Sequence, residues 1–324
     1  MDNVKAYLYD ARGRDEEVAI EEIDIKSLND DQILWVVIFL RDRETLANIT
    51  KILGLKDVPC DSIIDEEQGP ALEKYDDFFC FSVDSVDDHE KSSPARHKIN
   101  YIVGKNVVVT VSNGEPKYFQ EYRNREKGES SIGELDSESL VASLLDQNIV
   151  SYFRALHSLE SRIDKIDERI LKKDLDTDKF LDEMVRLRSD ASKLRRWLMP
   201  HREVYFALSR PDFQQVAEST ATEHYRLLSQ HFESAVDAIE HARESVLGVF
   251  DLYATKSSHM TNILIQRLTI LTLVLGTIGV MAGILGMNFK ADIFEAEYGF
   301  WITVAGLVIL GLAITIFAWK KRLI

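Results

Sequence analysis

Two runs of 22 residues without a charged side chain, 268–289 and 298–319, constrain this chain more than any other feature. A bilayer core of about 30 Å is crossed by about 20 apolar residues in a helix, so each run is long enough to span it. Buried helices of soluble domains rarely reach this length without a charge. We therefore expect two transmembrane helices.

The residues around the two runs predict their orientation. Lys320, Lys321 and Arg322 follow the second run, whereas the connection 290–297 carries one lysine and three acidic residues. We expect the protein to lie in the inner (plasma) membrane. The positive-inside bias then puts both termini in the cytoplasm and the connection outside. The N-terminal segment has no apolar core of a signal peptide, so we expect residues 1–267 to stay in the cytoplasm.

A long helix is predicted to lead into the first run. No proline follows Pro211, and Gly248 is the only glycine between Pro211 and Gly276. A helix from about residue 220 to residue 288 is about 100 Å long at 1.5 Å per residue. Because no globular domain conceals a helix of that length, we expect a stalk that packs against copies of itself.

The part before the stalk is predicted to contain an α/β domain, residues 1–115, and a helical region, residues 116–219. In the α/β domain, β-rich runs alternate with turn signals, and a helix is expected in RETLANITKILG. The expected strands are 5–10, 32–40, 78–83, and a hairpin of 99–103 and 107–112 around Gly104-Lys105-Asn106. In the helical region, apolar residues at helical spacing predict helices over 137–173 and 177–209.

One face of the long helix carries small and polar residues in its membrane half. The residues on this stripe, spaced three or four apart, are Asn262, Ile265, Leu268, Thr272, Gly276, Gly279, Gly283 and Gly286. Small residues at this spacing let helices pack closely in lipid. The same stripe fits a pore wall, where glycines expose backbone carbonyls and isoleucine and leucine close the path by dewetting. Both interpretations stay open.

Acidic and histidine residues mark the cytoplasmic half of the same helix. An acidic ridge recurs at Glu233, Asp237, Glu240, Glu244 and Asp251. A solvated helix face explains this ridge, and a regulatory cation site shared by several copies of the helix is the alternative. His224 and His231, or Asp237 with His241, have a spacing that could also hold a transition metal.

Composition excludes other classes of function. The chain has 54 acidic and 39 basic residues and a formal charge of −15, which disfavours a nucleic-acid partner. Cys60 and Cys80 have no metal-binding or disulfide spacing. No glycine-rich phosphate loop, GxSxG or HExxH motif is present, so we expect no enzyme and no resident cofactor.

Gly286-Met287-Asn288 at the end of the first span, and several stretches before it, resemble the CorA family of divalent-cation channels and transporters. Gly286-Met287-Asn288 closes the first span, as the family's GMN motif does, after a long stalk and before a short outer loop. The resemblance covers most of the chain and extends to QGPALEKYDD (68–77), IVGKNVVVTVS (102–112), LRRWLMPHREVYFAL (194–208) and DLYATKSSHMTN (251–262).

The resemblance implies an α+β membrane protein that forms a funnel-shaped homopentamer in the lipid bilayer. Its stalk helix, 220–289, would continue into the pore helix of the membrane at about 268–288, followed by the outer loop 290–297, the second span 298–319 and the basic tail 320–324. Gly286, Met287 and Asn288 would form the selectivity filter, with Ile265 and Leu268 as a hydrophobic gate. The outer-loop residues Asp292, Glu295 and Glu297 would attract cations.

Three departures from the family pattern bear on these roles. Thr277 and Gly279 stand where many members have a proline and a threonine. Lys290 follows directly after the GMN motif and phenylalanine, where the family's MPEL is absent. HYRLLSQH (224–231) replaces an acidic stretch of the upper stalk, so cation sensing would pass to the acidic ridge.

The predicted function is a pentameric Mg²⁺ channel or transporter that also passes Co²⁺ and Ni²⁺. A Zn²⁺ transporter of the same family is the first alternative, because the 194–208 stretch resembles the helix found in the zinc-transporting branch. A membrane-anchored sensor or scaffold, with the two spans only as an anchor, is the second.

Overall fold

The computed structural model describes the chain in two compact units, Met1–Val249 and Phe250–Ile324, here called the N-terminal and C-terminal units. The described residues are 3–10, 16–23, 28–29, 31–89, 92–126, 136–172, 177–210, 212–213, 221–286 and 298–320.

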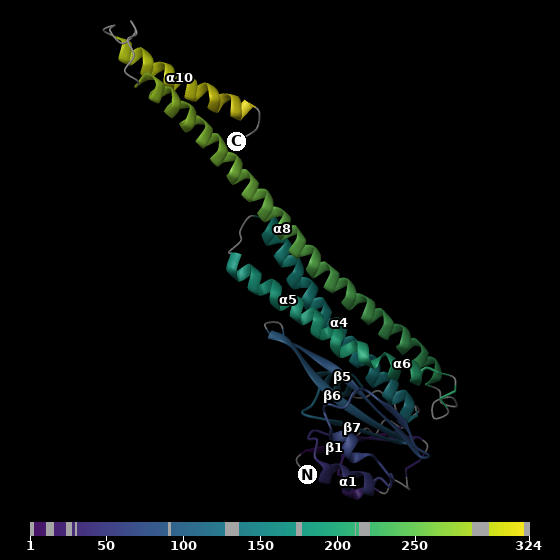
Figure 1. The fold of residues 1–324 in the computed structure, drawn as a ribbon. Helices are drawn as coiled ribbons and strands as arrows, with labels where there is room; N and C mark the ends of the chain where they lie inside the picture. Colours follow the sequence, from purple (N-terminus) through teal and green to yellow (C-terminus); the bar gives the residue numbers. More distant parts are fainter. Residues whose placement is uncertain are drawn as a thin grey trace. The chain divides into compact units, whose positions relative to one another are not determined.

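A seven-stranded sheet in the order β2-β1-β3-β7-β6-β5-β4 forms the base of the N-terminal unit (Figure 1). The strands are β1 (Val4–Asp10), β2 (Glu16–Val18), β3 (Gln32–Ile38), β4 (Leu72–Lys74), β5 (Phe78–His89), β6 (Ser92–Gly104) and β7 (Val107–Ser112). Only β3 and β7 pair in parallel, and the other pairs are antiparallel. The parallel pair is buried, as its apolar sequence predicts.

The two faces of the sheet are covered by different helices. Leu34 and Val36 of β3 belong to one core with Leu46 and Ile49 of helix α1 (Arg43–Ile52), next to helix α2 (Cys60–Ile64). On the opposite face, the Trp35 ring packs edge-on against Phe119 of helix α3 (Lys117–Glu126), with ring centroids 5.0 Å apart. The alternation of side chains along a strand therefore divides β3 between two cores.

Most predicted strands are confirmed, including the β6–β7 hairpin, and so is the predicted helix α1. The sequence missed the two edge strands, β2 and β4, which have three residues each. It also ended the 78–83 strand six residues early and began the 99–103 strand seven residues late. The missed part of the β5–β6 hairpin is polar, so cross-strand pairing forms it without a hydrophobic pattern.

The helical region contains α4 (Ser137–Lys172), α5 (Thr177–Leu198), a 3₁₀ turn η4 (Met199–His201) and α6 (Arg202–Leu208). The prediction of one helix over 177–209 was wrong at this turn. Pro200 has no N–H to donate to the preceding helical turn, and the chain passes through η4 before α6 begins.

Ion pairs join α4 to α5 in an antiparallel register. Arg162 contacts Asp190 at 2.8 Å, and seven residues along, Arg169 contacts Glu183 at 2.7 Å. Seven residues are about two helical turns, so both pairs lie along the same line of contact.

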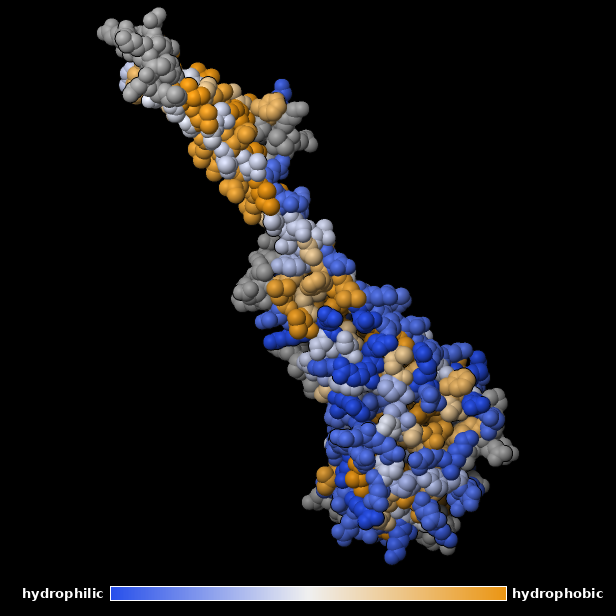
Figure 2. Space-filling model, viewed as in Figure 1, coloured by the Kyte–Doolittle hydropathy of each residue, from blue (hydrophilic) through white to orange (hydrophobic). Residues whose placement is uncertain are grey.

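Two helices are long and apolar enough to cross a membrane among the residues that the structure describes. Helix α8 (Thr222–Leu285) has 64 residues and confirms the long unbroken helix, and α10 (Gly299–Lys320) has 22. Figure 2 shows hydrophobic side chains gathered over the C-terminal half of α8 and over α10. In the most apolar stretch of each helix, 0% and 6% of residues are buried inside the chain, unlike the core helix of a soluble protein.

His97 of β6 gives the N-terminal unit a pH-dependent stability. Its Nε2 atom lies 3.2 Å from Oδ2 of Asp87, and this hydrogen bond raises the pKa of His97 above its usual value. The stabilisation is therefore complete below the unfolded-state pKa of about 6.5 and is lost as pH rises through the higher folded-state pKa.

We expect His97→Gln to lower the thermal unfolding temperature in detergent more at about pH 6 than at about pH 8.5, because only protonated His97 forms the ion pair. Differential scanning fluorimetry at both pH values measures this effect. An equal decrease at the two pH values would contradict the assigned ion pair.

Candidate functional site

The predicted stripe on α8 is exposed within the chain along its whole length. Every member is exposed, and Ile265 and Leu268 keep 56% and 63% of their surface accessible. The half-buried residues of the same segment lie on another face and are Ile263, Gln266, Ile270, Val274, Thr277 and Ile278. The stripe is therefore separate from the face of α8 that packs inside the chain.

Helix α10 packs on that other face through one glycine. A Cβ atom built on Gly311 would lie 3.1 Å from Cδ1 of Ile278 and 3.8 Å from Cγ1 of Val274. At about 100° per residue, Gly276 lies about 160° around α8 from each of these two residues. The second span therefore covers the side of α8 opposite the stripe.

The stripe glycines have no partner that explains them within the described residues. A Cβ atom on Gly276, Gly279 or Gly283 would meet nothing within 4 Å, apart from the helix's own nearby backbone. Close packing between the two spans of one chain is thus not the role of these glycines. Packing against other copies and lining a pore remain as interpretations.

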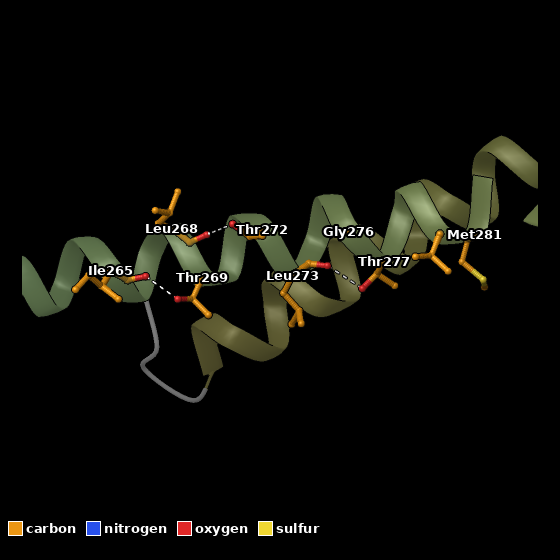
Figure 3. A pocket seen from close by; sticks show the side chains of 9 residues that line it. Ile265, Leu268, Thr269, Thr272, Leu273, Gly276, Thr277 and Met281 are labelled. Atoms are coloured by element: carbon orange, nitrogen blue, oxygen red, sulfur yellow. Dashed lines mark hydrogen bonds between the residues drawn. The ribbon is translucent and has the colours of Figure 1, made fainter. Parts of the chain in front are cut away.

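A groove of about 780 Å³ runs along α8 beside the stripe and includes four of the eight stripe residues (Figure 3). It is lined by Ile265, Leu268, Thr269, Thr272, Leu273, Gly276, Thr277, Val280 and Met281. Its polar groups are three hydroxyls, and each donates a 2.8 Å hydrogen bond to the carbonyl four residues earlier. The groove is apolar, with fixed hydroxyl oxygens at intervals.

The GMN motif lies at the edge of the described structure. The N–H of Gly286 donates to the carbonyl of Ala282 at 2.9 Å, so the helical hydrogen-bonding pattern reaches the motif. Met287 and Asn288 lie outside the described residues, as do the predicted outer-loop residues Asp292, Glu295 and Glu297. Their roles stay predictions.

The acidic ridge is partly neutralised by arginines of the same chain. Arg202 contacts Glu233 at 2.8 Å, and Arg195 contacts Glu240. The hydrogen bond from Arg195 holds the pKa of Glu240 below its usual value. Arg243 adds a contact to Glu240 at 3.3 Å. A cation binding to Glu233 or Glu240 would have to compete with these guanidinium groups.

The other ridge carboxylates, Asp237, Glu244 and Asp251, are exposed. Oε2 of Glu244 lies 3.8 Å from Nδ1 of His241, so His241 approaches Glu244 in addition to its predicted neighbour Asp237. Asp251 belongs to the C-terminal unit, whereas the first four ridge residues belong to the N-terminal unit.

His224 and His231 both line a cavity of about 250 Å³ between α4 and α8. Nδ1 of His231 lies 3.0 Å from Oδ1 of Asp146 on α4. Across the residues described, however, no three histidine, cysteine or acidic side chains are grouped to hold a metal ion. His231 therefore has one carboxylate neighbour, Asp146, but the described residues around the two histidines do not form the predicted transition-metal site.

His201, in the stretch that resembles the zinc-transporting branch, has a structural role. Its Nε2 accepts the backbone N–H of Asp84 at 2.9 Å, and its Nδ1 lies 3.3 Å from the carbonyl of Leu198. Burial lowers the pKa of His201, which keeps the ring neutral. Both ring nitrogens are engaged, so His201 joins η4 to β5 and is not free to bind a metal ion.

Sequence reasoning missed Gly311 as the contact between the spans. The available signal was the occurrence of Gly306 and Gly311 within an otherwise bulky apolar run. Spacing alone does not say which glycine faces α8. A Cβ atom on Gly306 would meet nothing within 4 Å, whereas one on Gly311 would touch two side chains.

Comparison with known proteins decides the family. Residues 30–322 match the family described as "CorA-like Mg2+ transporter protein". The chain belongs to the CorA family.

Curated and solved proteins match over most or nearly all of the chain. The "Cobalt/magnesium transport protein CorA" of Thermotoga maritima is 23% identical over 285 residues, which cover 86% of this chain and 80% of that protein. The complete structure of the CorA magnesium transporter from Methanocaldococcus jannaschii superposes with a TM-score of 0.80 at 19% identity, covering 98% of both chains. The full-length CmaX protein gives a TM-score of 0.73 at 18% identity, covering 99% of this chain and 98% of CmaX. The fold of a full-length CorA chain is thus shared.

We expect Gly311→Leu to destabilise the pairing of α10 with α8 by about 1–3 kcal/mol, because the new side chain must displace Ile278 and Val274. Thermal unfolding of the purified full-length protein in detergent measures the loss. Gly306→Leu is the matched control on the same helix, since its added side chain meets open space. Equal effects of the two substitutions would contradict the assigned contact.

Proposed function

We propose that the chain assembles as a homopentamer that conducts Mg²⁺ through a central pore lined by the stripe on α8. The observation that carries this proposal is the exposed glycine- and threonine-bearing face of α8, on the side opposite the contact with α10. Five copies arranged with these faces inward would place α10 on the outside, toward lipid. The groove would then be part of a shared pore, where exposed backbone and hydroxyl oxygens are useful.

The pore residues have distinct proposed roles. Asn288, with Gly286 and Met287, forms the selectivity filter, in which a ring of amide oxygens holds the ion through its waters. Mg²⁺ loses its waters reluctantly, so such a ring suits a hydrated ion. Ile265 and Leu268 form the gate, because a ring of apolar side chains closes a narrow pore by excluding water.

The chemistry of the described residues favours Mg²⁺, with Co²⁺ and Ni²⁺, over Zn²⁺. Zinc sites in proteins are built mainly from histidine and cysteine. The residues of the stripe carry amide, hydroxyl and backbone oxygens instead. His201, in the stretch that favoured the zinc alternative, is already engaged in hydrogen bonds to the backbone. The names of the matching relatives from Thermotoga and Methanocaldococcus refer to cobalt and magnesium transport.

The protein is proposed to lie in the inner (plasma) membrane with both termini in the cytoplasm. Lys320 at the end of α10, followed by Lys321 and Arg322, supports this orientation through the positive-inside bias. The acidic residues Asp292, Glu295 and Glu297 would then attract cations outside.

Regulation by cytosolic Mg²⁺ is proposed to act on the acidic ridge. An ion that binds the closed state better than the open state shifts the population toward the closed state. Because Glu233 and Glu240 have arginine partners, the main binding contribution is assigned to Asp237, Glu244 and Asp251.

We expect Asn288→Ala to reduce Mg²⁺ flux into liposomes at least about tenfold, which corresponds to a rate-limiting barrier about 1.4 kcal/mol higher. The reason is the removal of the amide oxygens that replace outer-shell contacts of the hydrated ion. Flux is measured with an internal Mg²⁺-sensitive dye, and chemical cross-linking checks that the oligomer still forms. Unchanged flux in an assembled Asn288→Ala oligomer would favour the sensor or scaffold alternative.

We expect the wild-type protein to carry Mg²⁺ faster than Zn²⁺ in parallel liposome assays at equal ion concentration, because its pore offers oxygen ligands. Ion-selective dyes report the two fluxes. Robust Zn²⁺ flux without Mg²⁺ flux would overturn the magnesium assignment in favour of the zinc alternative.

A further inference from the structure

Arg267 is the charged residue at the boundary between the polar and the apolar parts of α8. It immediately precedes the uncharged run 268–289, and it is the only basic or acidic side chain, histidine aside, between Lys256 and Lys290. On the other span, Lys320 directly follows the uncharged run 298–319. Both side chains are exposed. Each apolar run therefore has a positive charge at the end that is expected in the cytoplasm.

Arg267 lies on the side of α8 that meets α10. It precedes Val274 by seven residues and Ile278 by eleven, which at about 100° per residue places it within about 20° of each of them. Val274 and Ile278 are the two residues that a Cβ atom on Gly311 would approach. The same spacing puts Arg267 about 180° around the helix from Gly276, so Arg267 lies away from the stripe.

Lys320 ends α10 at about the same depth as Arg267. The two helices run antiparallel side by side (Figure 1), and Gly311 lies level with Gly276, midway between its two contacts on α8. Nine residues, about 14 Å of helix, separate Arg267 from Gly276 and Lys320 from Gly311. Lys320 is half a turn around α10 from Gly311, so the two basic side chains lie on either side of the end of α10.

Neither basic side chain has a carboxylate counterion. No acidic residue occurs in 252–291 or in 298–324, although the whole chain has a formal charge of −15. Among the residues that the structure describes, Arg267 and Lys320 form no ion pair. A charge at the edge of a hydrocarbon layer is costly to leave without a partner. The partner of Arg267 is therefore sought outside the chain.

The chemistry around Arg267 fits the phosphate of a lipid. A guanidinium group presents a planar fork of N–H donors that binds phosphate through two parallel hydrogen bonds. Leu271 lies one turn farther into the apolar run, about 40° around α8, and keeps 54% of its surface exposed. A phosphate site beside an exposed apolar surface suits a phospholipid, whose acyl chains continue from the headgroup, better than a free phosphate ion.

We propose that Arg267 binds the phosphate of an anionic phospholipid beside the C-terminal end of α10, in the cytoplasmic leaflet. Lys320, with Lys321 and Arg322 after it in the sequence, adds to the attraction, because basic residues just cytoplasmic of a membrane helix attract anionic lipids. This inference requires α8 and α10 to span the membrane, but it does not depend on which ion the protein carries.

The test is native mass spectrometry of the full-length protein in detergent, titrated with phosphatidylglycerol or phosphatidylcholine. We expect the wild type to bind phosphatidylglycerol more tightly than phosphatidylcholine. Arg267→Gln should weaken phosphatidylglycerol binding by about fivefold, the effect of removing one basic group at an anionic surface. Arg267→Lys restores the charge and should recover most of this affinity. Binding of phosphatidylcholine, which has no net charge, should stay unchanged in both variants.

Arg226→Gln is the matched control on the same helix. Arg226 is exposed, and its Nε atom donates to Glu223 at 2.9 Å, so this arginine already has a carboxylate partner. It belongs to the N-terminal unit, outside the apolar run. We expect its affinity for phosphatidylglycerol to equal that of the wild type. Equal affinities of Arg267→Gln and Arg226→Gln would overturn the proposed site.

A soluble anion is the competing ligand for Arg267. We expect phosphatidylglycerol to stay bound to the wild type in a large excess of inorganic phosphate, and its displacement would overturn the assignment to a lipid. A wild type without preference for phosphatidylglycerol would also overturn it, even if Arg267→Gln fails to assemble. Mg²⁺ flux of the wild type in liposomes tests the proposed function separately, so normal flux without this preference contradicts the lipid site alone.

Discussion

The continuous hydrogen bonding of α8 is the constraint on which the other parts depend. In the hydrocarbon core each backbone N–H and C=O must be satisfied within the chain, which a helix achieves segment by segment. Sixty-four residues without proline allow one helix to contain both a charged stretch and an apolar stretch long enough to cross a membrane. The same helix therefore carries the acidic ridge, the residues proposed as the gate and the approach to the GMN motif.

Two lines of arginine contacts organise the helices of the N-terminal unit. Arg162 and Arg169 of α4 bind acidic residues of α5, while Arg195 and Arg202 bind the ridge residues Glu240 and Glu233 of α8. The two α4–α5 contacts are seven residues apart on both helices, as expected for antiparallel helices in register, whereas Arg195 and Arg202 lie on different helices, α5 and α6, on the two sides of η4. Partly exposed ion pairs are individually worth only about 0–1 kcal/mol, so they set register more than stability.

Much of the fold follows from the sequence, because its signals are local. The absence of proline after Pro211 predicted α8, the uncharged run 298–319 predicted α10, and the β-branched run 107–112 predicted β7. The polar tip of the β5–β6 hairpin and the short edge strands were missed, since their pairing depends on neighbours distant in sequence. At the candidate site, the stripe was predicted from the sequence. The contact of Gly311 on α10 with the opposite side of α8 was not.

By itself, the sequence determined the two apolar spans, the long helix, the glycine stripe and the GMN motif, because each is a pattern along one segment. Only the tertiary structure decided what each face meets. Gly311 contacts Ile278 and Val274, so the stripe glycines are left without a partner in the chain. Arginines from α5 and α6 neutralise part of the acidic ridge. Such pairings depend on side chains brought together from separate helices, and no spacing within one helix encodes them.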